Sequence, residues 1–228
     1  VLSVSPGGMG LILFSIAGIA LLVVFARKEL RAELGQRRGL LDMAAGLVEN
    51  PQLTVGRDGY PQLDGTWGED RIRLEVVSDS LVPRRLPQLW LKSTLLTREE
   101  TPRPSIGVLA RPIGTEFYSR ALGLPDTLAP PFNTDTPMLI RGRGLSEGDL
   151  QGAGGMLRGL FADPTLKEIV ITPRGAGLVR QIAQGDRGAH VLYRQIRFPV
   201  THVPPDLVRN ALAELRLLNE ALKPAASA

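Results

Sequence analysis

The chain of 228 residues contains no cysteine, only two histidines and few aromatic residues. The lack of cysteine excludes a disulfide-stabilised scaffold, an iron–sulfur or thiolate–zinc site, and a cysteine nucleophile. His190 falls in a strand-like pattern and His202 in a proline-flanked loop. Neither has the neighbouring residues that a metal site or a catalytic triad needs. The sequence therefore predicts no catalytic residue, no metal ligand and no cofactor.

Charge is absent from the first 26 residues. Met9 to Ala26 form an 18-residue run that is apolar on every side of a helix and about 27 Å long, close to the thickness of a bilayer core. We predict a transmembrane helix over residues 9–28, after a short outward N-terminus over 1–8. A cleaved signal peptide is the alternative, but no cation precedes the run and no good cleavage site follows it. The expected anchors are Leu11, Phe14, Ile19, Leu22 and Phe25, with Arg27 and Lys28 at the interface.

Positive charge is concentrated directly after this run. Arg27 to Arg38 contain five cations and two anions, a net charge of +3 out of +4 for the whole chain. A nucleic-acid-binding domain carries its basic residues on the folded domain itself, so we expect no nucleic-acid partner. The positive-inside rule predicts a single-pass membrane protein with its N-terminus outside. In this arrangement the C-terminal domain is cytoplasmic and Arg27–Arg38 lie near anionic lipid headgroups.

The rest of the chain predicts a helical stalk over residues 29–50 and a cytoplasmic α+β domain over 51–228. "DRIRLEVV" places Ile72, Leu74 and Val76 on one face of a strand, and similar patterns predict an antiparallel sheet. "AHVLYRQIRF" predicts another strand, and Pro204-Pro205-Asp206 starts a C-terminal amphipathic helix. Strands and helices come in blocks, which favours α+β over a doubly wound fold.

"MLIRGRGLSEGDLQGAGG" resembles a loose dinucleotide-binding fingerprint, because a strand is followed by glycines from Gly142 to Gly148 and then a helix. No βαβ repeat surrounds it, and the next strand ends in Thr172-Pro173 rather than in an acid for ribose. The helix after it carries a glycine stripe, which favours close packing against a sheet or a partner helix instead. The residues predicted for helix packing are Gly10, Ser15, Gly18, Gly152, Gly155 and Gly159.

The segment "LPDTLAPPFNTDTP" is a proline-rich loop with apolar residues outside regular structure. A loop of this kind contacts either its own domain or a partner. Leu128, Pro131 and Phe132 are the candidate partner contacts.

The stretches "PQLDGTWGEDRIRL", "PPFNTDTPMLIRGRG" and "DPTLKEIVIT" resemble those of uncharacterised bacterial single-pass membrane proteins over about residues 60 to 183. The layout, though not the sequence, is similar to the H subunit of purple-bacterial reaction centres. That resemblance implies a non-catalytic accessory or stabilising subunit of a bacterial membrane complex, such as a photosynthetic reaction centre–antenna or respiratory assembly. It also implies a bacterial inner (cytoplasmic or intracytoplasmic) membrane as the location, with other transmembrane subunits as partners. Two alternatives stay open: a membrane-tethered regulatory or sensor module that binds a soluble partner, and a nucleotide- or phosphate-binding enzyme that uses the Gly142–Gly148 turn.

Overall fold

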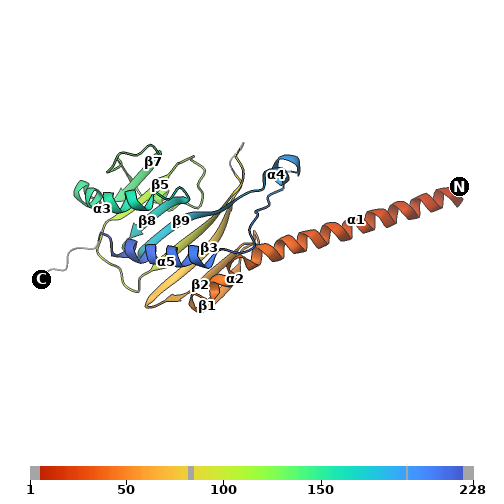
Figure 1. The fold of residues 1–228 in the computed structure, drawn as a ribbon, viewed down its shortest axis with the longest axis horizontal. Coiled ribbons are helices and arrows are strands. Elements are labelled where there is room, and N and C mark those ends of the chain that lie inside the picture. The colour runs from red at the N-terminus through yellow and green to blue at the C-terminus, as the bar shows by residue number, and fades with distance from the viewer. Residues whose placement is uncertain (1–5, 82–84, 194, 223–228) are drawn as a thin grey trace.

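The computed structural model of the protein describes residues 6–81, 85–193 and 195–222, with the backbone alone described at 6–13, 30, 192 and 193. One long helix projects from a domain built on a single twisted sheet (Figure 1). The helices of the described chain are α1 (Pro6–Arg38), the short 3-10 helix η1 (Gly39–Leu41), α2 (Asp42–Ala45), η2 (Ala121–Gly123), α3 (Glu147–Leu160), α4 (Arg187–Tyr193) and α5 (Pro205–Glu220).

Within the described ranges nine strands form one sheet in the order β1-β2-β3-β4-β9-β8-β5-β7-β6, and every neighbouring pair is antiparallel. Strands β1 to β4 are neighbours in the sheet in their chain order. The β8–β9 hairpin, which comes later in the chain, lies between β4 and β5 in the sheet. The strand bounds are β1 (Glu49–Val55), β2 (Pro61–Trp67), β3 (Asp70–Asp79), β4 (Gln88–Leu96), β5 (Ser105–Ala110), β6 (Asp126–Leu128), β7 (Met138–Arg143), β8 (Leu166–Thr172) and β9 (Gly175–Gln184).

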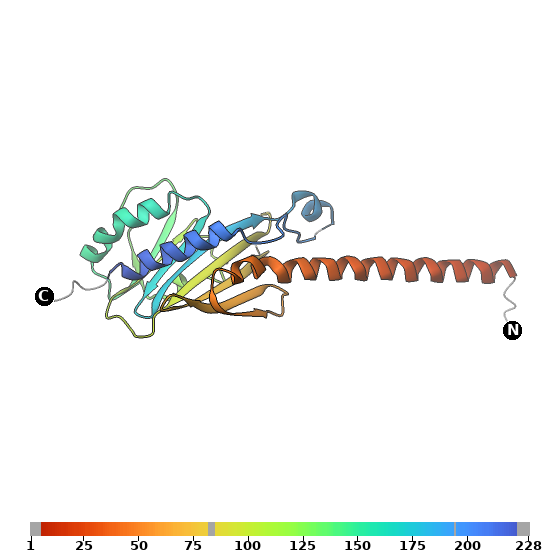
Figure 2. The same ribbon diagram turned by 60° about the horizontal axis from the view of Figure 1, so that its bottom comes forward.

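The main hydrophobic core lies between one face of this sheet and the helices that cover it. Figure 2 shows α5 lying along this face, with α3 on the same side. The alternation predicted for β3 is confirmed, because Ile72, Leu74 and Val76 are all buried in this core. The helices contribute residues from η1, α2, α3 and α5, among them Leu40, Ala44, Leu157, Leu212 and Leu215.

The opposite face of the sheet is covered differently along its width. Over β2, β3 and β4 it carries ion pairs, including Arg73 with Asp64 at 2.7 Å. Over β9, β8 and β5 it is covered by the 111–120 loop and by η2. Two small apolar clusters form there, one around Trp90 and Tyr118 and the other around Leu109 and Ala121.

The C-terminal end of helix α1 is attached to the domain, and the rest of the helix projects away from the domain (Figures 1 and 2). In the described part of the chain, no helix is both long enough and apolar enough to cross a membrane.

The predicted transmembrane helix over 9–28 is therefore wrong, and so are the α+β fold with one membrane span and the single-pass inner-membrane location that rest on it. The layout shared with the reaction-centre H subunit loses its membrane span. The residues that lose their predicted anchoring role are Phe14, Ile19, Leu22, Phe25, Arg27 and Lys28, and the side chain of Leu11 lies outside the described residues.

Two other local predictions are also corrected. The stalk over 29–50 is not one helix: α1 ends at Arg38, η1 and α2 follow, and β1 already begins at Glu49. The strand predicted from "AHVLYRQIRF" is absent from the described residues there, because Arg187–Tyr193 form α4 and the chain after it has no regular structure. This segment packs against α1, as described next.

Candidate binding pocket at the base of helix α1

The last three turns of α1 present one face toward the domain. The residues on this face recur at the i, i+3, i+4 spacing of a helix surface, which places them in a single stripe. On α1 they are Glu29, Ala32, Glu33, Gln36 and Arg37, and Leu40 of η1 continues the stripe. Leu40, at the lower end of the stripe, is buried in the main core. The stripe therefore changes from exposed and charged to buried and apolar as it approaches the sheet.

The 195–203 segment runs alongside this stripe and is tied to it by hydrogen bonds. Gln36 Nε2 donates to the carbonyl of Val200 at 2.8 Å, and an Arg37 guanidinium N–H donates to that of Ile196 at 3.3 Å. The backbone N–H of Val203 donates to the carbonyl of Leu40 at 2.8 Å. These contacts join residues that are about 160 positions apart in sequence.

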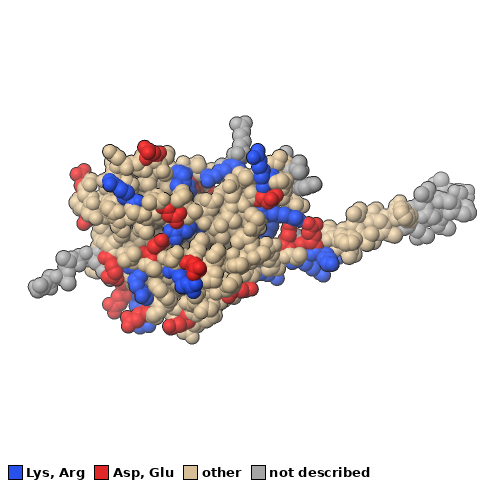
Figure 3. All heavy atoms as spheres, in the orientation of Figure 1, with Lys and Arg blue, Asp and Glu red and all other residues tan. Residues whose placement is uncertain are grey.

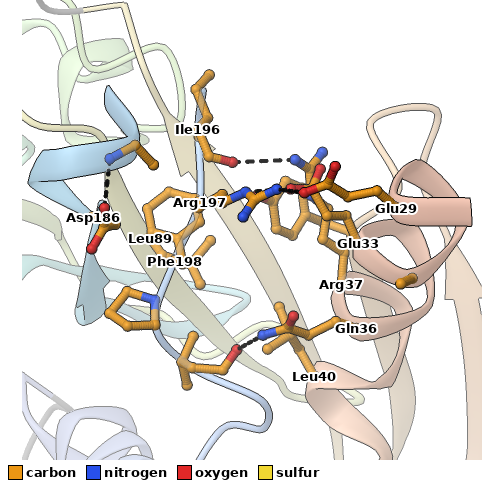
Figure 4. A pocket seen from close by; sticks show the side chains of 15 residues that line it. Glu29, Glu33, Gln36, Arg37, Leu40, Leu89, Asp186, Ile196, Arg197 and Phe198 are labelled. Carbon is orange, nitrogen blue, oxygen red and sulfur yellow. Dashed lines mark hydrogen bonds and ion pairs between the residues drawn. The ribbon is translucent and has the colours of Figure 1, made fainter. Parts of the chain in front are cut away.

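Arg197 closes the upper end of this contact. It forms ion pairs with Glu29 and with Glu33, the latter at 2.6 Å from Nε to Oε1 (Figure 4). The hydrogen bond that Arg197 donates to Glu29 and the negative charge of Glu33 raise the pKa of the Arg197 guanidinium. Because Glu29 and Glu33 are one turn apart on α1, a single arginine bridges both carboxylates and fixes the segment to the helix.

A pocket of about 580 Å³ lies between α1 and the segment. Its apolar lining comes from four parts of the chain: Leu40, Tyr60 and Leu89 on the domain side, and Phe198 and Val200 on the segment. Figure 4 shows the charged side chains of α1 and Arg197 on one side of the cavity, with Asp186 on the other.

The aromatic ring of Tyr60 is a fixed part of the pocket wall. Burial raises the pKa of its hydroxyl, and the nearby Arg37 acts in the opposite direction. The Arg37 guanidinium lies 5.5 Å from the centre of the Tyr60 ring, within cation–π distance. Arg37 therefore has both a ring and a carbonyl as partners inside the pocket wall.

The Gly142–Gly148 turn does not form a phosphate cradle. A side chain at Gly142 would meet Leu128 and Leu145 at 3.0 and 3.2 Å, so apolar groups fill the space beside the strand end. Gly144 has a positive φ of 63°, which glycine adopts without strain, so the turn needs a glycine at this position for its backbone conformation. At the N-terminus of α3, Ser146 and Asp149 form a complete capping box, so a carboxylate already occupies the position that an anion would take.

The predicted helix-packing glycines of α3 point away from the protein. A methyl group at Gly152, Gly155 or Gly159 would meet no other atom within 4 Å. The buried side of α3 is formed instead by Leu150, Ala153, Gly154 and Leu157. Packing of the stripe against the sheet is thus wrong, and packing against a partner helix stays a prediction. On α1, a methyl group at Gly18 would meet no atom within 4 Å, and Ser15 is exposed. The surroundings of Gly10 lie outside what the structure describes.

The residues of the predicted partner loop contact their own domain. Phe132 is buried in the main core and Leu128 packs against it. Arg158 of α3 lies over the Phe132 ring at 5.4 Å, and Pro131 lies 3.4 Å from the position of a methyl group on Gly154. These contacts attach the loop to α3.

Buried ionisable groups are concentrated on the loop-covered face of the sheet. Lys167 Nζ donates to Glu116 at 2.8 Å and to the carbonyl of Arg111 at 2.8 Å. Glu116 accepts the backbone N–H groups of Ile113 and Gly114 at 2.8 and 2.9 Å. Burial raises the pKa of the Glu116 carboxyl, but the hydrogen bonds from Lys167 and Ile113 outweigh it, so the pKa is lowered overall. Each group thus holds the 111–120 loop in place.

Glu168, the next residue of β8, holds the end of the same loop. Its carboxylate accepts the Ser119 hydroxyl and, at 3.1 Å, the backbone N–H of Arg120. Burial raises the pKa of Glu168, and the bonds from Ser119 and Arg120 reduce that shift only in part. In the described residues no group of three or more His, Asp or Glu side chains is placed to hold a metal ion.

Sequence reasoning did not find the pocket, because its two walls come from distant parts of the chain. The one local indication was the stripe from Glu29 to Leu40, in which charged and apolar residues share a helix face. Comparisons of the chain with models of known protein families, with curated proteins and with solved structures found no match.

Proposed function

We propose that the protein is a non-catalytic accessory subunit, and that a partner protein surrounds the apolar part of helix α1. The observation that carries this proposal is the exposure of large apolar side chains on every side of that helix. The exposed residues are Phe14, Ile16, Ile19, Leu21, Leu22, Val23, Val24 and Phe25. Figure 3 gives the same picture, since no charged atom interrupts the described part of the helix beyond its base.

The energetic argument is that this surface favours burial in an assembly. Removing a large apolar side chain from water is worth about 1.5–3 kcal/mol when burial is complete. Contiguous exposed apolar patches of this kind mark interaction sites in folded proteins. Eight such side chains within three to four turns supply enough free energy to hold a partner in a stable complex.

The distribution of these residues favours a partner protein over a second copy of the chain. Consecutive helix positions are about 100° apart, so Leu21, Leu22, Val23 and Val24 point in four directions. All four are exposed, between 44% and 70%. One helix of a second copy covers one side only and leaves the others in water. A groove or bundle of several partner helices covers all of them, and Ser15 and Gly18 allow one of those helices to approach closely.

The domain then serves as a brace at the base of α1. The η1 and α2 residues are packed in the core, and α1 is hydrogen-bonded to the 195–203 segment. These contacts hold α1 in a fixed direction relative to the sheet. The non-catalytic part of the proposal is supported by the buried ionisable residues. Lys167, Glu116 and Glu168 all bind backbone or side-chain groups of the 111–120 loop, a structural use of each.

The test is recovery of the partner with the tagged full-length chain from the cells that naturally make it. The Ile19→Lys variant places a charge in the apolar part of α1 and is expected to lose a stoichiometric partner that the unaltered chain retains. Ile113→Lys is the matched control, because Ile113 is an exposed isoleucine on the 111–120 loop, away from α1. Recovery of the chain alone as a monodisperse species, or equal retention by both variants, contradicts the proposal.

A further inference from the structure

We propose that the pocket at the base of α1 binds a small cationic amphiphile: an organic amine or guanidine attached to an apolar body. This inference does not depend on the proposed function, because the pocket is formed by this chain alone. The exposed apolar part of α1 ends at Phe25, and the pocket lining begins one turn later at Glu29.

The size and lining of the pocket suit an apolar body. A volume of about 580 Å³ falls within the 300–1,000 Å³ that is typical of small-molecule sites. Leu40, Tyr60 and Leu89 form an apolar wall whose members are almost completely buried, so they are held in place by the core. Phe198 and Val200 face them from the segment.

The charges of the pocket select the head group. Three carboxylates, those of Glu29, Glu33 and Asp186, line it together with two guanidinium groups, so its formal net charge is −1. Both guanidinium groups are already used within the walls. Arg197 bridges Glu29 and Glu33, and Arg37 donates to Ile196 while it lies over Tyr60.

Acceptor capacity remains on the carboxylates. A carboxylate offers about four acceptor positions. Asp186 uses Oδ1 to accept the backbone N–H of Ala189 at 2.6 Å, and Glu29 is 61% exposed beside its bond from Arg197. A ligand that donates hydrogen bonds adds to this arrangement, whereas an anionic ligand faces three carboxylates and finds donors only on Arg37 and Arg197, which already have partners in the walls. The site therefore favours a cation.

The experiment is a fluorescence titration of the full-length protein with three probes that share one fluorophore. Dansylcadaverine carries a primary amine, dansylglycine a carboxylate, and dansylamide no charge. We expect saturable binding of dansylcadaverine at one site and affinity for dansylglycine at least about tenfold weaker. Equal binding of the amine and the carboxylate overturns the proposal.

Two pairs of variants locate the site. Ala32→Trp fills the pocket from an exposed helix position, and Ala20→Trp makes the same change on the projecting part of α1. Only Ala32→Trp is expected to remove binding; loss with Ala20→Trp as well places the probe on the apolar helix and overturns the proposal. Asp186→Asn is expected to weaken amine binding about three- to tenfold with dansylamide binding unchanged, whereas Glu99→Gln, an exposed carboxylate outside the lining, leaves both unchanged. An equal effect of Asp186→Asn on both probes contradicts the charge selection.

Discussion

Lys167 and Glu116 form an ion pair with 2.8 Å between Nζ and Oε1, and neither side chain is more than 2% exposed. The pair joins β8 to the 111–120 loop, on the sheet face that no long helix covers. Two buried charges of opposite sign carry a large desolvation cost, which their mutual attraction and additional hydrogen bonds offset. The carbonyl of Arg111 and the N–H groups of Ile113 and Gly114 supply those bonds. The loop is therefore fixed by polar contacts as much as by apolar ones.

Removing one member of this pair is expected to destabilise the protein strongly. Lys167→Met leaves Glu116 buried without its cation, and we expect a loss of about 3–5 kcal/mol in the free energy of unfolding. The double variant Lys167→Met with Glu116→Gln is expected to lose less than the single one, since it buries no unpaired charge. Urea denaturation measures both. The exposed pair of Arg174 and Glu100 is the control, and Arg174→Ala should change stability by less than about 1 kcal/mol. A loss from Lys167→Met as small as that of the control contradicts this account.

The raised pKa of Glu168 predicts a pH dependence of stability. In the folded protein Glu168 keeps its proton to a higher pH than in the unfolded chain, where its pKa is about 4.5. The folded state binds more protons, so this contribution is complete below pH 4.5 and is lost as pH rises through the raised pKa. Glu116, whose pKa is lowered, contributes in the opposite sense: its stabilisation is present above its unfolded value and is lost as pH falls.

Glu168→Gln should therefore reduce the decline in stability above pH 4.5 without removing the loss at acid pH. The free energy of unfolding, measured by urea titration at intervals from pH 4 to pH 8, checks this. A decline that is as steep in Glu168→Gln as in the unaltered protein would show that Glu168 is not its source.

Arg103 caps the C-terminal end of helix α5 and attaches that end to the β8–β9 hairpin. Its guanidinium donates to the carbonyl of Thr172 and to the side-chain oxygen of Asn219, both at 2.8 Å, and to the backbone carbonyls of Asn219 and Ala221. Lysine lacks the planar fork that reaches several acceptors, so Arg103→Lys is expected to cost about 2 kcal/mol and to expose the last turn of α5 to hydrogen exchange. Arg209→Lys, at an exposed pair with Asp206 on the same helix, should change neither measurement.

Two glycine substitutions are expected to act in opposite directions. A methyl group at Gly107 of β5 would lie 2.6 Å from the Cβ of Ala121, so Gly107→Ala must displace η2 and should cost about 1–3 kcal/mol. Gly152→Ala in α3 meets open space and replaces glycine within a helix, which should add up to about 1 kcal/mol. Thermal denaturation of both variants under one set of conditions shows whether each substitution raises or lowers the stability. A stabilising Gly107→Ala would contradict the close approach of η2 to the sheet.

The parts of the fold that follow from local sequence were predictable. The alternation of Ile72, Leu74 and Val76 gives β3 its buried face, and the helix predicted beside the Gly142–Gly148 turn is α3, which Ser146 and Asp149 cap. The Pro204-Pro205 start of α5 also follows from proline's fixed φ and missing N–H. Such features depend on residues a few positions apart.

The parts that failed depend on contacts between distant residues. Arg187–Tyr193 has the β-favouring residues of a strand but forms α4, whose first turn is held by Asp186 Oδ1 accepting the backbone N–H of Ala189. The chain after it is bound to α1 through Arg197, which pairs with Glu29 and Glu33. The glycine stripe of α3 suggested packing, yet the packed side is set by Leu150 and Leu157. The pocket could not be predicted for the same reason, since its walls are joined only in the folded chain.

Site-specific photo-crosslinking shows whether a partner protein surrounds α1. A photoreactive amino acid is placed in turn at Leu21, Leu22, Val23 and Val24, which sample all sides of the helix. The account predicts adducts to the same partner from all four positions. Adducts from one side only, adducts to a second copy of the chain, or no adduct at any position would contradict it.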